Sequence, residues 1–238
     1  MRIFMAKKSP PSWLLEAPLV LIVSLFGLPF VAKGIGYLGL KREYVILLSF
    51  ILQQGGFILG TIYLKNKYPL YPDETIVFKP NWHQFFRSLL WLPAIFLLSI
   101  FAISISTQIL TPIVGPEKLE RILLRETTRV DLVLLESLGV FVSALLVCVV
   151  GPISEEFFFR GFFFSRMCAT YSPKTAYLIT SLFFALPHFY VINFLPIFLL
   201  SLVLCYIAQH EGLWGAIGAH VFFNSLVFIS MILQITAS

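Results

Sequence analysis

The chain has 238 residues, of which 58% are hydrophobic and only 12% are charged, and its formal net charge is +5. Soluble domains carry about 25% charged residues, so this composition excludes an ordinary soluble protein. In a chain this apolar, an excess of Lys and Arg is typical of membrane topology and of contact with anionic lipid. We therefore expect the protein to contact a lipid bilayer and not to bind nucleic acid.

The apolar runs predict an all-α, polytopic transmembrane bundle with about seven spans. Only helices or closed barrels satisfy every backbone hydrogen bond in lipid, and the runs are long enough for helices. Residues 1–11 are basic and precede the first run without a small-residue cleavage site, so the first span is expected to be retained. The protein is then an integral, multi-pass membrane protein, in the plasma membrane if the source is prokaryotic. The expected spans are 13–32, 44–64, 88–110, 132–168, 175–190, 196–209 and 213–235.

Two features of the first half stand out. Residues 111–131 alternate charged and apolar side chains at helical spacing, which predicts an amphipathic helix on the membrane surface. Gln53 and Gln54 lie in the middle of the second span, where ordinary helix contacts are favoured over a cavity. The chain is expected to divide into residues 1–131, with N-terminal helices and the amphipathic connection, and residues 132–238, a transmembrane core with the candidate site.

Three charges interrupt an apolar run at Glu155, Glu156 and Arg160. Each ionisable group within a span costs about 2.5–3.5 kcal/mol on insertion scales, so such groups mostly pair or carry out chemistry. A helix advances about 100° per residue, which places Arg160 about 40° from Glu156 and about 140° from Glu155. We expect Arg160 to pair with Glu156 and to leave Glu155 free as a working acid or base.

The length of this run predicts a distortion near the charges. An unbroken helix over 135–168 would be about 51 Å long, which exceeds the roughly 30 Å hydrocarbon core. The helix is therefore expected to break, tilt or emerge from the bilayer. Pro152 is the natural point of distortion because it lacks a backbone donor, and Ser154 is a candidate cap for the next segment.

Further polar residues lie in the last three spans. His188 follows Pro187, which loosens the helix, and His220 and Asn224 are four residues apart and so share one helical face. Small residues at the start of the last span, with Gly218 among them, let another helix approach closely. Two His, one Asn and the Glu pair in spans with little else polar predict a hydrated pocket at membrane depth.

Three short motifs of this chain, in the order in which they occur, resemble those of a known family. They are Glu155-Glu156-x-x-x-Arg160, Phe184-x-x-x-His188 and His220-x-x-x-Asn224. The family is the CAAX-protease and bacteriocin-processing family, also called CPBP or Abi, of intramembrane proteases, which includes the Rce1-type prenyl-protein proteases. The resemblance covers about residues 135–230. It implies a glutamate-type endopeptidase whose substrate is a peptide or membrane protein, prenylated or not.

The resemblance also implies a role for each residue. Glu155 would be the general base that activates a water, and His188 would hold that water. His220 and Asn224 would donate hydrogen bonds to the oxyanion, and Glu156 with Arg160 would brace the site. A preorganised pair of donors contributes about 3–4 kcal/mol to transition-state stabilisation, a plausible share of peptide hydrolysis.

Two alternatives remain open. Glu155, His188 and His220 are suitable zinc ligands, so the same protease with zinc as cofactor is one of them. A mechanism without metal or other cofactor is favoured for two reasons. The sequence has no His-Glu-x-x-His pattern, and Asn224 is a poor zinc ligand but a good oxyanion donor. The second alternative is a non-catalytic membrane protein, a scaffold, immunity or transport factor, in which the same groups relay protons or pair helices. The lack of internal repeats disfavours a transporter.

Overall fold

The computed structural model describes residues 12–69 and 79–237, and every regular element in these residues is a helix. The basic segment 1–11 and part of the connection between the second and third predicted spans lie outside the described residues. The predicted all-α class is confirmed.

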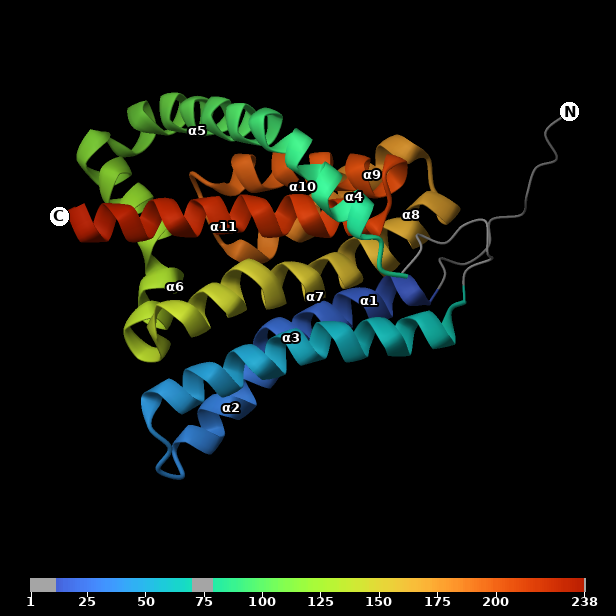
Figure 1. Ribbon diagram of the computed structural model, residues 1–238, viewed down its shortest axis with the longest axis horizontal. Coiled ribbons are helices and arrows are strands. Elements are labelled where there is room, and N and C mark those ends of the chain that lie inside the picture. The colour runs from blue at the N-terminus through green and yellow to red at the C-terminus, as the bar shows by residue number, and fades with distance from the viewer. Residues whose placement is uncertain (1–11, 70–78, 238) are drawn as a thin grey trace, which may run out of the picture.

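An antiparallel pair of long helices forms the N-terminal layer (Figure 1). The first rod is continuous over Trp13–Gly36 and consists of α1 (Trp13–Ile22), a π-helical turn η1 (Val23–Gly27) and α2 (Leu28–Gly36). The second is α3 (Arg42–Lys67). Glu16 pairs with Lys67 at 2.8 Å and so joins the start of the first rod to the end of the second.

The third rod begins earlier than its sequence predicts. It consists of α4 (Trp82–Arg87), η3 (Ser88–Trp91) and α5 (Leu92–Val114), whereas the prediction placed residues 82–87 in a connection. The helix begins here because the Asn81 side chain accepts a hydrogen bond from the Gln84 backbone N–H, at 3.1 Å, and caps α4.

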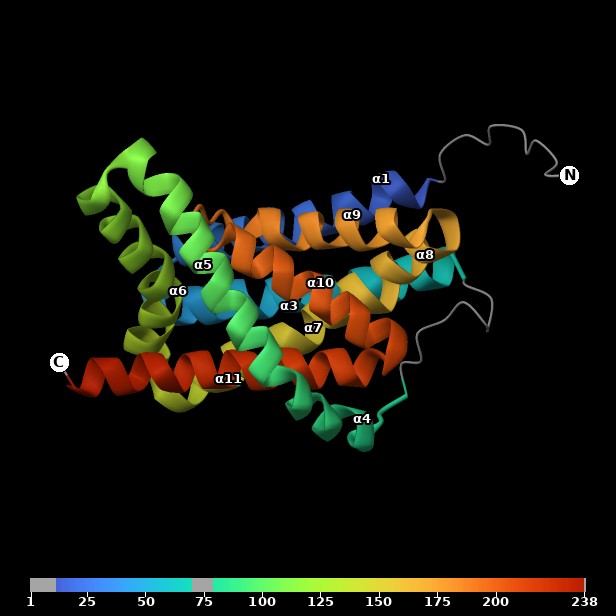
Figure 2. The same ribbon diagram turned by 90° about the horizontal axis from the view of Figure 1, so that it is seen from above.

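A long helix, α6 (Pro116–Ala144), follows the turn at Gly115 and crosses one end of the bundle (Figures 1 and 2). The helix predicted in 111–131 is present from Pro116 onward, and its position on the membrane surface stays a prediction. Gly139 interrupts α6 with a φ of 76° and a ψ of 165°. Only glycine adopts this backbone conformation readily, so the chain bends here.

The rod that carries the Glu pair covers Leu135–Thr170, 36 residues, and is interrupted at Gly139. Beyond Gly139 it consists of the end of α6, η4 (Leu145–Val150), α7 (Gly151–Phe158), η5 (Phe159–Phe164) and α8 (Ser165–Thr170). The helix does not break at Pro152, but the distortion expected there is present, because Pro152 directly follows a π-helical turn. The π-helical turn η4 just before it absorbs the distortion, and the sharp bend is at Gly139.

Ser154 does not cap a helix, contrary to the expectation. The residue before α7, Val150, already has helical dihedral angles, so no separate helix start exists there. The Ser154 hydroxyl is buried and donates instead to the Gly151 carbonyl oxygen, at 2.9 Å, and to the Gln54 side chain of α3. It therefore joins two helices at the level of the Glu pair.

The C-terminal elements surround this central helix. They are α9 (Pro173–Ala185), the 3-10 turn η6 (Leu186–His188), α10 (Phe194–His210) and α11 (Leu213–Ala237). In Figure 1, α7 lies between the α1–α3 layer and α11, and α10 packs on both α9 and α11. All six residues of η5 are buried. The helix with the three charges is thus the centre of the molecule.

Close packing against α11 depends on Gly218. A Cβ atom at this position would lie 2.5 Å from Ser88 Oγ and would collide with the Phe85 carbonyl oxygen. The predicted close approach of a helix to the start of α11 is therefore confirmed, and the approaching helix is α4 with η3.

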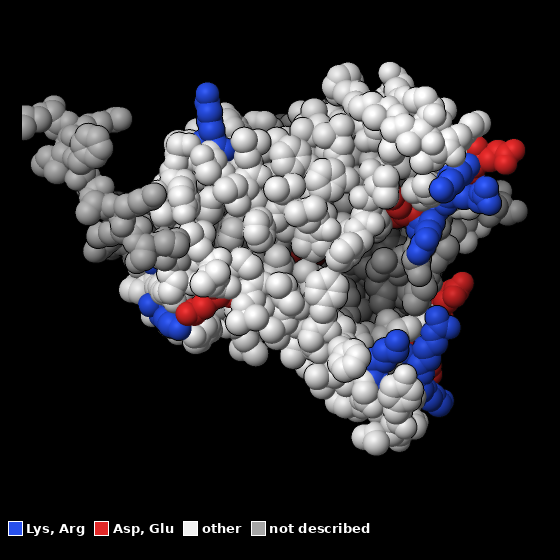
Figure 3. All heavy atoms as spheres, turned by 180° about the vertical axis from the view of Figure 1, so that it is seen from behind, with Lys and Arg blue, Asp and Glu red and all other residues white. Residues whose placement is uncertain are grey.

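The described residues contain five helical rods long and apolar enough to cross a membrane: Trp13–Gly36, Arg42–Lys67, Trp82–Val114, Leu135–Thr170 and Leu213–Ala237. The other two predicted spans are the shorter α10, of 17 residues, and α9, of 13. In Figure 3 most Lys, Arg, Asp and Glu side chains lie towards the two ends of the face, and the band between them consists almost entirely of uncharged residues. The chain is an integral membrane protein, and the number of seven spans stays a prediction.

Candidate active site

Glu156 is the anchor of a buried polar network. Its Oε1 lies 2.7 Å from Arg160 NH1 and 2.9 Å from His220 Nδ1, and both Glu156 and Arg160 are fully buried. The pairing of Arg160 with Glu156 that the helical spacing predicts is confirmed. Because a carboxylate paired in this way accepts from two donors at once, it orients both of them.

Arg160 extends the network to two further helices. Its NH2 donates to the carbonyl oxygen of Ser201, at 3.1 Å, and to the Ser201 hydroxyl, at 2.7 Å, both on α10. Its guanidinium lies 4.5 Å from the centre of the Phe184 ring on α9. A buried charge is tolerated only with such partners, and here they tie α9, α10 and α11 to the central helix.

Glu155 stands apart from this network. Its side chain is partly exposed, and it makes no hydrogen bond or ion pair with the described residues. The two adjacent carboxylates thus have different environments, one held by two donors and one unpaired. This is the arrangement in which one of two carboxylates acts as acid or base.

His188 is held by its own helix end. The chain leaves α9 through η6, and His188 Nδ1 lies 2.9 Å from the Phe184 carbonyl oxygen. A carbonyl only accepts hydrogen bonds, so Nδ1 carries the proton and the neutral ring presents Nε2 as an acceptor. Phe189 follows in the left-handed conformation, with a φ of 54° and a ψ of 31°, and turns the chain away from α9.

The same reasoning applies to His220, which the carboxylate of Glu156 orients. Its Nδ1 donates to Glu156 Oε1, so Nε2 of the neutral ring is an acceptor, and a donor at Nε2 requires a doubly protonated ring. One turn further along α11, the Asn224 amide donates to the Val147 carbonyl oxygen of η4, at 3.2 Å. The second N–H of that amide has no partner among the described residues.

Phe184 connects the two histidines. Its ring centre lies 5.3 Å from that of His188 and 5.8 Å from that of His220, and the side chain is 1% exposed. Its carbonyl accepts from His188, and its ring faces Arg160. Sequence reasoning quoted Phe184 as part of a motif and gave it no role, because nothing in an apolar span distinguishes this Phe from its neighbours.

A cavity of about 920 Å³ opens beside His188. Its walls come from α2, α3, α6 and the segment after η6, and Figure 3 shows a hollow bordered by Lys and Arg side chains at its open end. Of the residues expected to face the predicted pocket, only His188 lines this cavity, so a hydrated pocket shared by all of them stays a prediction. Apolar residues on its walls include Pro29, Val45, Ile46, Phe50 and Ile122.

The two glutamines of α3 have separate roles. Gln53 lines the cavity, so the preference for an ordinary helix contact is wrong for this residue. Gln54 is 4% exposed and accepts the hydrogen bond from Ser154, so the preference is confirmed there. Adjacent helical residues differ in direction by about 100°, which is why one faces the cavity and the other the protein.

Glu126 is a residue of this region that sequence reasoning missed. Its carboxylate accepts from the backbone N–H groups of Val191, Ile192 and Asn193 at 2.6–3.3 Å, and from the Asn193 amide at 3.2 Å. Within the charged stretch 117–131 it has no distinguishing signal. In the folded chain, Glu126 holds the segment that connects His188 to α10.

The three residues considered for zinc do not form a metal site in this arrangement. Within residues 12–69 and 79–237, no group of three His, Cys, Asp or Glu side chains is placed to hold one metal ion. His220 uses Nδ1 on Glu156, and His188 uses Nδ1 on Phe184. Glu155, His188 and His220 are thus not gathered around one ion here, although Nε2 of both histidines has no partner among the described residues and a ligating His commonly has its Nδ1 held in this way.

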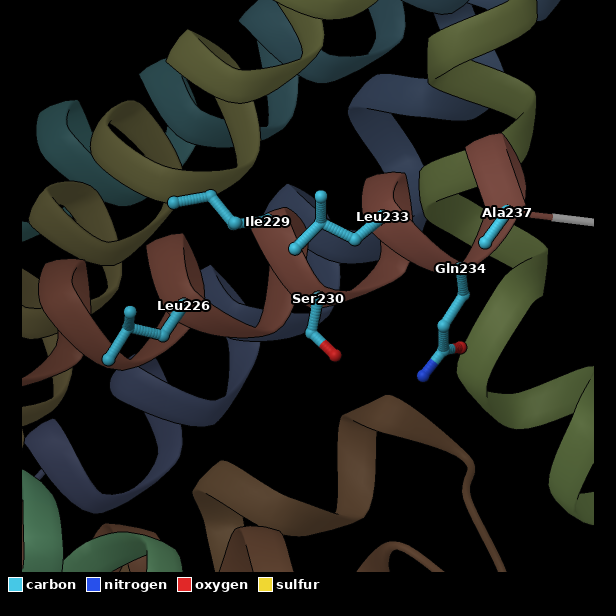
Figure 4. A pocket seen from close by; sticks show the side chains of 6 residues that line it. All are labelled: Leu226, Ile229, Ser230, Leu233, Gln234 and Ala237. Atoms are coloured by element: carbon cyan, nitrogen blue, oxygen red, sulfur yellow. The ribbon is translucent and has the colours of Figure 1, made fainter.

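A second hollow, of about 450 Å³, lies on the C-terminal half of α11. Figure 4 shows the side chains of Ser230 and Gln234 pointing from the same side of the helix, with Leu226, Ile229 and Leu233 beside them. It contains no ionisable side chain and no motif residue. The chemistry of the chain is therefore concentrated at the first cavity and the Glu156 network.

Comparison with known proteins points to one family. Residues 137–226 match the family model described as type II CAAX prenyl endopeptidase Rce1-like. No curated protein and no solved structure matches the chain. The matched region runs from the end of α6 into α11 and contains all three motifs. The resemblance that the motifs indicate is confirmed over residues 137–226, which are similar to this Rce1-like family model.

Proposed function

We propose that this protein is an intramembrane endopeptidase in which Glu155 activates the attacking water. The observation that carries the proposal is the unequal environment of the two carboxylates. Arg160 and His220 hold Glu156, whereas Glu155 has no partner among the described residues. A general base needs a free carboxylate, and a rigid neighbouring network keeps it in place.

In the proposed reaction Glu155 removes a proton from a water molecule. The oxygen of that water attacks the carbonyl carbon of the peptide bond, and a tetrahedral oxyanion forms. When the carbon–nitrogen bond breaks, the protonated Glu155 gives the proton to the leaving amine. His188 accepts a hydrogen bond from the same water at Nε2, which fixes its position.

The oxyanion is assigned to Asn224 and His220. Asn224 has a second N–H available, and His220 donates from Nε2 in its doubly protonated form. Glu156 holds His220 through Nδ1, which supports this role because a donor that is already oriented costs no reorganisation during reaction. Glu156 and Arg160 thus act as positioning residues.

The substrate that fits this proposal is a peptide with apolar side chains, because the cavity beside His188 has mainly apolar walls. The matching family model is described as a prenyl endopeptidase, so a prenylated C-terminal peptide is the first substrate to test. A cell membrane is the proposed location, since both enzyme and substrate then lie in the same bilayer.

The test is cleavage of a fluorogenic prenylated peptide, and of its unprenylated form, by detergent-purified protein. We expect cleavage by the parent and at least about 10³-fold slower cleavage by the Glu155→Gln variant, as for other essential catalytic groups. Gln preserves the shape of Glu155, so equal thermal stability of both proteins is the control. Equal rates for the two proteins would contradict the assignment of Glu155, and no cleavage of any peptide would favour a non-catalytic role.

The metal-free mechanism has a separate test. Active protein is exhaustively chelated, assayed, and analysed for bound metal. We expect activity to persist without stoichiometric metal. Loss of activity that zinc restores would replace this mechanism with the zinc-dependent alternative while leaving the peptidase function in place.

A further inference from the structure

Two cations lie on the wall of the cavity that also contains His188. Lys33 belongs to the last turn of α2, and Arg125 belongs to α6, so they come from segments far apart in the sequence. Both side chains are exposed, and neither has an ion pair with a described residue. Figure 3 shows Lys and Arg side chains bordering the hollow.

The cavity does not neutralise these two charges itself. Glu126 is the one acidic residue among the described residues that line it. Its two oxygens are engaged by the backbone N–H groups of Val191, Ile192 and Asn193 and by the Asn193 amide. The carboxylate is therefore committed to the segment after His188, and Lys33 and Arg125 remain as unpaired positive charge beside apolar walls.

We infer that Lys33 and Arg125 bind a carboxylate of the peptide substrate. This inference rests on the proposed function and specifies its substrate: a peptide with apolar side chains for the walls and a free carboxylate for the cationic end. Arg and Lys are suited to this role, since charge-assisted hydrogen bonds to carboxylates are about twice as strong as neutral ones. A volume of about 920 Å³ is within the range of sites that enclose small ligands.

A peptide is favoured over a lipid headgroup because of His188. The cations line the same cavity as His188, so an occupant of the cavity lies beside the residue proposed to hold the attacking water. A lipid phosphate at Lys33 and Arg125 would place acyl chains, and no peptide bond, along the walls. The carboxylate is either the C-terminal one or an acidic side chain near the end of the peptide.

The experiment measures binding without turnover, in the full-length Glu155→Gln variant in zwitterionic detergent. Three fluorescent apolar peptides of the same sequence are compared: one with a free C-terminal carboxylate, one amidated, and one amidated with an added C-terminal Glu. We expect the two peptides with a carboxylate to bind on the order of tenfold more tightly than the neutral amide, which corresponds to one charge-assisted interaction. A preference for only one of the two acids identifies which carboxylate is bound.

The preference should depend on the two cations. Adding Lys33→Gln and Arg125→Gln together should bring the carboxylate peptides to the affinity of the amide and leave the amide unchanged. The matched control combines Lys41→Gln and Arg121→Gln in the same background. These changes also remove one Lys and one Arg, close in sequence to Lys33 and Arg125, but neither residue lines the cavity. The control should retain the preference.

Several results would overturn the inference. Equal affinity for all three peptides, including no binding by any of them, would do so, as would a preference that survives in the double variant of Lys33 and Arg125. Adding anionic lipid should weaken the preference only modestly through screening. If anionic lipid abolishes it, the cations are headgroup sites. Cleavage by the parent without a carboxylate preference refutes this inference alone, whereas a preference without any cleavage refutes the proposed peptidase alone.

Discussion

Replacing Glu156 by Gln should destabilise the fold far more than replacing Glu155 by Gln. Both changes remove one negative charge and almost no volume, and the two residues are adjacent on the same helix. They differ in their partners: Glu156 Oε1 accepts from Arg160 at 2.7 Å and from His220 at 2.9 Å, whereas Glu155 has no partner among the described residues. The pair therefore isolates the effect of the buried network.

The magnitude follows from the burial of Arg160. Its side chain is fully buried, so loss of its counter-charge leaves an uncompensated positive charge that has no access to solvent. Breaking a buried ion pair from one side costs about 3–5 kcal/mol. The Ser201 contacts reduce this cost, so we expect about 3 kcal/mol for Glu156→Gln and at most about 0.5 kcal/mol for Glu155→Gln.

The measurement is thermal unfolding of both variants and the parent in the same detergent, with peptide cleavage measured below the transition. A double variant, Glu156→Gln with Arg160→Met, removes both charges and should recover part of the lost stability, since replacing a buried pair by apolar groups is often neutral. Equal stability of Glu155→Gln and Glu156→Gln, together with an equal loss of activity, would refute the division of roles between the two carboxylates.

Three further outcomes are expected. Asn224→Ala should lower kcat by about 10²–10³ with little change in KM, because an oxyanion donor acts mainly in the transition state; an unchanged kcat would remove Asn224 from the mechanism. Glu126→Gln should lower kcat by up to about 10²-fold, because a shift of about 1 Å in the segment that Glu126 holds would misplace His188. Glu117→Gln on the same helix is the control and should match the parent in the same assay. Gly218→Ala should lower the stability of the fold by about 1–3 kcal/mol, because the new Cβ collides with η3 and α4. Gly55→Ala is the control, since a Cβ there meets no atom within 4 Å. Equal unfolding temperatures of the two variants would show that the contact at Gly218 relaxes freely.

The sequence by itself determined the fold class and indicated the residues of the candidate site. Lipid leaves helices as the natural solution for long apolar runs, so hydropathy was enough to predict the all-α architecture. The pairing of Arg160 with Glu156 was also accessible, because the spacing within one helix fixes which side chains are neighbours. The three motifs, read in order, indicated the family to which residues 137–226 match.

Local rules were less successful where the backbone had alternatives. Pro152 predicted a distortion, which the structure has as the π-helical turn η4 directly before it, but the sharp bend is at Gly139. A proline within a continuous helix can be accommodated by a local π-helical turn, whereas a glycine can adopt a positive φ wherever packing requires it. Asn81 likewise began a helix inside a predicted connection.

Only the tertiary structure decided which distant residues meet. His220 binds Glu156 across 64 positions in the chain, Ser201 binds Arg160 across 41, and Glu126 binds the segment after His188. Lys33 and Arg125 line one cavity although α2 and α6 are separated by two long helical rods. The helical period of the sequence states which face of its own helix a residue occupies. The partner on that face depends on how the helices pack, and this packing depends on close contacts such as that at Gly218.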